Sequence, residues 1–163
     1  MQLENLQKLF VHELRDLYNA ENQILDALPD MIDRTSDDRL RSALQEHLEQ
    51  TRGQVERLDR IFRDMGEDPK GQKCKGMEGL LREAKDLLAE DAAPAVRDAG
   101  IISSAQRVEH YEIAGYGTAL TYAKLLDDTE ATRLLQETLD EEKNADRELT
   151  EVAEGTVNIK AMD

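Results

Sequence analysis

Several ionisable side chains interrupt the apolar faces of this chain, and Glu21 is the clearest of them. The other residues on its helical stripe are aliphatic, namely Leu14, Leu17, Ile24 and Leu28. In such surroundings an unpaired carboxylate costs several kcal/mol or stays protonated. We therefore expect Glu21 to be a metal ligand or to have another buried polar role.

The search for ionisable residues on apolar stripes also selects five residues from three later segments. His47 lies at the edge of one apolar stripe, and Glu109 and Glu112 border a second. Glu142 and Asp146 fall together with leucines on a third stripe. If the chain reverses near residues 35 and 128, antiparallel neighbours mirror about those turns, and all of these side chains lie at about the same depth.

The chemistry of such a layer indicates a metal site. Carboxylates gathered at one level repel one another unless protons or cations compensate them. Hard oxygen ligands with a single imidazole suit Fe or Mn. The sequence therefore predicts a di-metal site in the middle of a helical bundle, with the ligands Glu21, His47, Glu109, Glu112, Glu142 and Asp146.

Simpler explanations exist for individual residues. Glu142 lies in a segment rich in acids, where one inner carboxylate can arise by chance. Glu109 or Glu112 could instead pair with Arg107 at the surface. His47 is equally consistent with a hydrogen-bonded histidine at a helix interface.

Other polar residues are candidates for supporting roles. Tyr18, Tyr111 and Tyr116 could donate hydrogen bonds to carboxylates, although core packing is the usual role of a tyrosine. His110 projects away from the inner stripe, so we expect it at a dimer contact rather than at the metal.

The segments that must position these residues have the periodicity of amphipathic helices. Apolar residues recur every three or four positions, which predicts helices over 3–33, 37–65, 77–90, 94–126 and 129–154. The tail from Gly155 is expected to be frayed. Four long helices in two hairpins, joined by a long connection with its own short helix, are typical of the ferritin-like antiparallel four-helix bundle. We interpret residues 1–163 as one such all-α domain.

Composition excludes several classes of function. The 163 residues are 39% hydrophobic and only 4% aromatic, which favours helices over a sheet sandwich. The formal net charge of -15 disfavours nucleic acid and an anionic membrane surface as partners. The N-terminus is charged every few residues and has no signal-peptide pattern, so a cytoplasmic protein is expected.

Five segments spread along nearly the whole chain are fairly specific in combination. They are LYNAENQILDALPDM, EHLEQTRGQVERLDRI, KCKGMEGLLREA, AQRVEHYEIAGYGT and ETLDEEKNADRELT. Together they resemble the YciF/YciE-type ferritin-like stress proteins of bacteria. The resemblance implies a homodimer with a fold related to rubrerythrin and other di-iron proteins, but it implies no established activity.

The match to the usual di-iron pattern is incomplete. That pattern has Glu on two helices and Glu-x-x-His on the other two. Glu21 matches the first helix, and Glu109 and Glu112 match a Glu-x-x-Glu variant on the third. The second helix offers His47, Thr51 and Gln54 instead, and Glu142 lacks its histidine, with Asp146 as a substitute. The absence of two histidines argues against tight binding of two irons and against oxygen activation.

Two hypotheses follow. The first is a stress-response protein that binds Fe or Mn at this site, with peroxide-reducing or ferroxidase-type activity. The alternative is a non-enzymatic, dimeric helical-bundle interaction protein without a catalytic metal. In the alternative, the apolar residues of helix 77–90 and the outer side of the third long helix would form the dimer contact.

Overall fold

The computed structural model of the protein describes residues 3–163, and this part of the chain contains helices and no strand. The helices are α1 (Leu6–Arg34), α2 (Asp38–Met65), α3 (Lys75–Ala89), α4 (Pro94–Leu125), α5 (Thr129–Val152), the π-helix η1 (Ala153–Val157) and α6 (Asn158–Lys160). The prediction of an all-helical fold is confirmed. In residues 3–163, every helix is either too short or too polar to cross a membrane.

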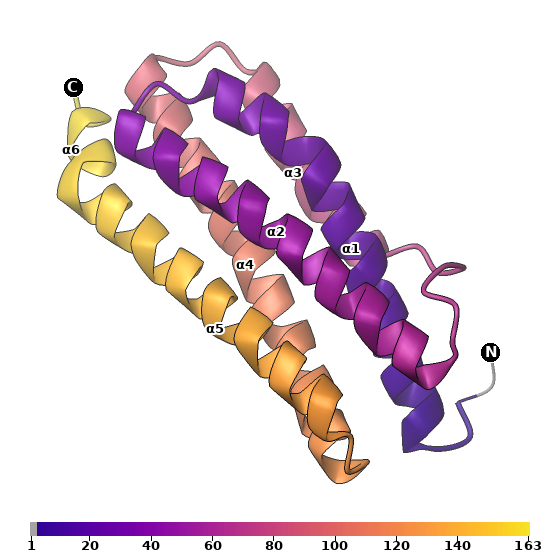
Figure 1. The fold of residues 1–163 in the computed structure, drawn as a ribbon. Helices are drawn as coiled ribbons and strands as arrows, with labels where there is room; N and C mark the ends of the chain where they lie inside the picture. The colour runs from indigo at the N-terminus through magenta and orange to yellow at the C-terminus, as the bar shows by residue number, and fades with distance from the viewer. Residues whose placement is uncertain (1–2) are drawn as a thin grey trace.

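The four long helices run side by side (Figure 1). The contacting pairs of long helices are α1 with α2, α2 with α5, α5 with α4, and α4 with α1. Each long helix therefore has two long neighbours. The segment between α2 and α4 returns along the length of the molecule and carries α3, which packs on α1 and α4 (Figure 1).

Polar side chains define where the long helices begin. The Asn5 side chain accepts a hydrogen bond from the Lys8 amide at 2.9 Å, so α1 begins at Leu6 rather than at the predicted residue 3. Asp37 caps α2 and Asp128 caps α5 in the same way. These caps satisfy amide groups that have no partner within the helix.

The C-terminal tail was predicted to be frayed from Gly155, but it is helical through Lys160. The chain continues beyond α5 as one π-helical stretch, Ala153–Val157, and then as the short α6. Ala153 and Val157 are both buried in the core formed by the neighbouring helix ends. Burial of these two side chains explains why the tail remains helical. The polar residues around Gly155 gave no indication of this burial in the sequence.

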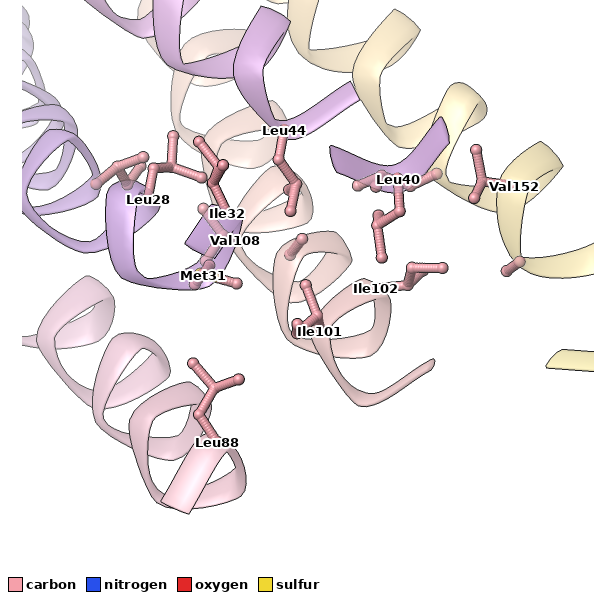
Figure 2. Packing of buried hydrophobic residues seen from close by; sticks show 14 of the residues in the cluster. Leu28, Met31, Ile32, Leu40, Leu44, Leu88, Ile101, Ile102, Val108 and Val152 are labelled. Atoms are coloured by element: carbon pink, nitrogen blue, oxygen red, sulfur yellow. The ribbon is translucent and has the colours of Figure 1, made fainter. Parts of the chain in front are cut away.

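The apolar core consists of two clusters. One cluster joins the end of α1, the start of α2 and α4, the end of α5, and α3; Figure 2 shows Leu28, Leu44, Leu88, Ile101 and Val152 within it. The other joins the opposite ends of the four long helices and includes Phe10, Leu14, Leu58, Phe62, Tyr116 and Leu135. Between the two clusters every long helix carries polar residues, so the core is divided by a polar layer.

The apolar residues of α3 are covered by the same chain. Leu88 is buried with Met31 and Ile101 (Figure 2), and Leu80 and Leu81 pack against the same cluster. Leu87 lies so close to Gly100 that a Cβ there would meet a leucine methyl at 2.6 Å. The apolar face of α3 thus has partners on α1 and α4 within the same chain.

Asp98 of α4 holds the turn between α1 and α2. Its carboxylate is buried and accepts hydrogen bonds from the amides of Ser36 and Asp37, each at 2.8 Å. Through these bonds the first hairpin is attached to the second. An ionised acceptor of this kind contributes to stability, because its removal deprives the two turn amides of charge-assisted hydrogen bonds.

We predict that Asp98→Ala lowers the free energy of unfolding by about 2–4 kcal/mol, since hydrogen bonds to charged groups contribute about 1.5–3 kcal/mol each. Urea denaturation of the variant and the wild type measures the difference. Asp26→Ala on the exposed side of α1 is the matched control and is expected to change stability by less than about 0.5 kcal/mol. Equal losses in both variants would contradict the anchoring role of Asp98.

Candidate metal centre

The polar layer contains five ionisable side chains from all four long helices. They are Glu21 on α1, His47 on α2, Glu109 and Glu112 on α4, and Glu142 on α5, and all are buried. Glu109 and Glu112 face the same way because residues three apart share one side of a helix. These five of the six predicted ligands come together in the structure.

Four of the five side chains form a compact group. His47, Glu109, Glu112 and Glu142 each offer one ligand atom, and these atoms lie within 4.8 Å of one another. Glu21 lies next to this group, because the charge of Glu142 acts on the Glu21 carboxyl and the charge of Glu21 acts on the Glu112 carboxyl. The group is therefore of the size and composition that a divalent cation requires.

Most of the ligand-type atoms in the layer have no hydrogen-bond partner. The unpaired atoms are Glu21 Oε2, both ring nitrogens of His47, Glu109 Oε2, both carboxyl oxygens of Glu112, and Glu142 Oε2. Buried polar atoms are almost always paired, because an unpaired one loses its hydration without replacement. This arrangement fits Fe or Mn, for which such atoms are ligands.

Two of the remaining oxygens, one on Glu21 and one on Glu142, accept hydrogen bonds from neutral donors. The Tyr116 hydroxyl donates to Glu21 Oε1 at 2.5 Å, as one of the tyrosine predictions anticipated. The Gln54 amide donates to Glu142 Oε1, also at 2.5 Å. Glu21 and Glu142 are thus each oriented through one oxygen, and the other oxygen of each remains without a hydrogen-bond partner.

His47 has a different neighbour. Its Nε2 lies 3.2 Å from Glu109 Oε1, within the range of an ion pair but without hydrogen-bond geometry. The backbone carbonyl of His47 accepts from the Thr51 hydroxyl at 2.8 Å. The Thr51 hydroxyl, which the sequence suggested as a replacement ligand, therefore donates to the backbone of its own helix.

Burial makes these carboxyl groups weak acids when no cation is present. Loss of hydration raises the pKa of Glu21 from 4.5 to about 8, and the charge of Glu142 adds to the rise. The same two causes, burial and then Glu142, raise the pKa of Glu109 and of Glu112 well above the usual value. The apolar surroundings thus favour protons or cations in the layer.

Comparison with known proteins assigns the chain to a family. Residues 5–162 match the family described as "Domain of unknown function (DUF892)". YciF of Escherichia coli strain K12 is 43% identical over 162 residues, which are 99% of this chain and 98% of YciF. The protein belongs to the DUF892 family.

Solved structures of similar proteins have the same fold. The crystal structure of the E. coli stress protein YciF has a TM-score of 0.91 and covers 95% of this chain and 98% of its own. YcfI from Rhodopseudomonas palustris is 42% identical with a TM-score of 0.88, covering 91% of this chain and 95% of its own. A protein from Xanthomonas campestris pv. campestris is only 18% identical, covers 94% of each chain and has a TM-score of 0.75, so it shares the fold alone.

Asp146, the sixth predicted ligand of this DUF892 protein, lies outside the cluster. Its Oδ2 is 3.1 Å from His110 Nε2, and its Oδ1 accepts from the Gln106 amide at 3.3 Å. The His110 side chain is 67% exposed, in agreement with the prediction that it faces away from the inner stripe. Asp146 therefore pairs with the exposed His110 near the surface and not with the buried cluster.

Gln54 has a contact that the sequence did not predict. Its amide nitrogen bridges Glu142 and Glu141, with a distance of 3.0 Å to Glu141 Oε2, and its buried Oε1 has no hydrogen-bond partner. Glu141 in turn accepts from Arg57 Nη2 at 2.6 Å, and this contact raises the pKa of Arg57. The only sequence signal was the position of Gln54 beside the apolar stripe of α2.

We predict that the metal-free protein becomes less stable as the pH rises from about 4.5 to about 8. Glu21 binds its proton more tightly in the folded state, so the stabilisation is complete below the unfolded pKa and disappears as the pH passes the folded pKa. Glu109 and Glu112 act in the same direction. Urea unfolding in the presence of a chelator, repeated across this pH range, measures the trend.

Glu21→Gln removes one of the titrating groups and should reduce the slope of stability against pH. Glu56→Gln, at an exposed position on α2, is expected to keep the slope of the wild type. A stability that rises over this pH range in the wild type would disprove the assignment of protons to the buried carboxyls.

Proposed function

We propose that this protein is a ferritin-like stress-response protein that binds Fe or Mn within its polar layer. The observation that supports the proposal best is the set of buried carboxylate and imidazole atoms without hydrogen-bond partners. The arrangement of the long helices, with one long connection carrying α3, fits the ferritin-like bundle with an extended crossover.

The charge of the layer supports a count of two divalent cations. Glu21, Glu109, Glu112 and Glu142 carry four negative charges when ionised, and His47 is neutral as a ligand. In the described part of the chain, no Lys or Arg forms an ion pair with these four carboxylates; the one ion-pair contact joins His47 and Glu109. Two divalent cations would therefore neutralise the ionised site.

The residues around the layer fit this function. Tyr116 and Gln54 fix one oxygen of Glu21 and Glu142 and so orient the free oxygens. The two apolar clusters on either side exclude bulk water. Bound Fe or Mn would supply Lewis acidity and a change of oxidation state, as peroxide reduction or ferrous iron oxidation requires.

The biological setting comes from the relatives. YciF of E. coli is described as a stress protein, and we extend that description to this chain because of the 43% identity over its whole length. We further propose a cytoplasmic homodimer. Since α3 is covered by its own chain, the dimer contact would use other surfaces, such as the outer side of α4.

Anaerobic loading with Fe(II) or Mn(II), followed by elemental analysis of tag-free protein, tests the site. The wild type is expected to retain about two equivalents, as in di-metal carboxylate proteins. Glu21→Gln and Glu142→Gln should each retain fewer than half as many, because each variant loses a ligand and a charge. Asp146→Asn should retain the wild-type amount, since Asp146 lies outside the cluster.

Glu56→Gln is the control for a change of surface charge and should load like the wild type. If the wild type and the ligand variants retained no metal, the non-enzymatic interaction protein would become the better explanation. If Asp146→Asn alone failed to bind, the ligand set would be wrong. Peroxide and ferroxidase assays are informative only after the metal content is known.

A further inference from the structure

Two narrow openings reach the polar layer, and both end at His47 and Glu109. One is a cavity of about 10 Å³ between α2 and α5, with the exposed Glu46 at its outer end. The other, also about 10 Å³, lies between α1, α3 and α4. The second cavity shares Ala27, Met31 and Leu81 with an open groove of about 670 Å³ between α1 and α3.

The two openings differ in chemistry. Glu46, Gln50 and Glu148 line the opening between α2 and α5, together with Asn144. Apart from His47 and Glu109, the other opening has only apolar walls, such as Leu28 and Val108. A hydrated divalent cation needs oxygen ligands to replace its water, so only the opening between α2 and α5 suits it.

The inner end of that opening has side chains ready to receive a cation. His47 and Glu109 side chains are only 6% and 2% exposed. Both ring nitrogens of His47 and Oε2 of Glu109 lack hydrogen-bond partners. Oxygen ligands at the surface are thus followed inward by unpaired ligands in the interior.

We propose that divalent cations enter the polar layer between α2 and α5, from Glu46 and Glu148 to His47 and Glu109. This inference rests on the proposed function, because it assumes that the layer holds metal. The two surface carboxylates attract the hydrated cation and replace part of its water, and His47 and Glu109 are its first buried ligands.

The side chains at the mouth can move aside at low cost. A volume of about 10 Å³ holds no more than one water-sized sphere, so a cation passes only if the lining shifts. Glu46 is exposed and makes one weak contact, accepting from the Gln50 amide at 3.3 Å. Glu148 forms no ion pair among the described residues. Neither carboxylate is tied to the fold.

Stopped-flow loading of the metal-free protein with Co(II), followed by the absorbance of the bound ion, tests the route. The double variant Glu46→Gln/Glu148→Gln should load about 10-fold more slowly at low ionic strength, the lower end of electrostatic steering effects. Its final stoichiometry should equal that of the wild type, because the buried ligands are unchanged. The difference should shrink at high salt.

Two controls separate this route from general effects. Glu56→Gln/Asp140→Asn removes the same charge from exposed positions on α2 and α5, away from the opening, and should load at nearly the wild-type rate. Leu81→Trp narrows the apolar opening and should also leave the rate unchanged.

Three other results would overturn the proposal, and each would point to a different cause. Equal slowing by both double variants would show that overall charge, not the opening, sets the rate. Slowing by Leu81→Trp would assign entry to the α1–α3 side. If the wild type itself bound no Co(II), Fe(II) or Mn(II) at equilibrium, the proposed function would fail, and the entry route with it.

Discussion

The structure depends on one costly arrangement, the burial of four carboxylates and an imidazole in a single layer of an apolar interior. Without protons or cations these carboxylates would repel one another in surroundings that cannot screen charge. The raised pKa values of Glu21, Glu109 and Glu112 express this cost, with burial as the main cause. Protons can neutralise the layer when no metal is bound, and under the proposed function two divalent cations would match its ionised charge.

The rest of the fold supports this layer. Two apolar clusters lie on either side and supply the stabilisation that the polar residues cannot. Asp98 attaches the first hairpin to the second, so all four helices hold a defined depth. Tyr116 and Gln54 give neutral hydrogen bonds to Glu21 and Glu142, which orients the carboxylates without cancelling their charge.

The layer is also asymmetric, and this asymmetry has a functional consequence. On one side α3 covers the bundle with leucines, so the approach to His47 and Glu109 there is apolar. On the opposite side α2 and α5 meet without such a cover, and Glu46 and Glu148 lie at the surface. Under the proposed entry route, the short helix α3 in the long connection limits the approach of a cation to the side between α2 and α5.

The sequence by itself determined the helices and most of the buried acids. Helical periodicity and capping are local, so α2, α4 and α5 begin and end within two residues of prediction, and Glu21 was recognisable among its aliphatic neighbours. Only the tertiary structure decided which polar residues meet. Glu142 and Asp146 are one turn apart on one predicted stripe, yet the packing of α5 against α4 directs Glu142 to the centre and Asp146 to His110. The partners of Gln54 and the cover over α3 were undetermined for the same physical reason, because they depend on how helices rotate and pack against one another rather than on any pattern within a single helix.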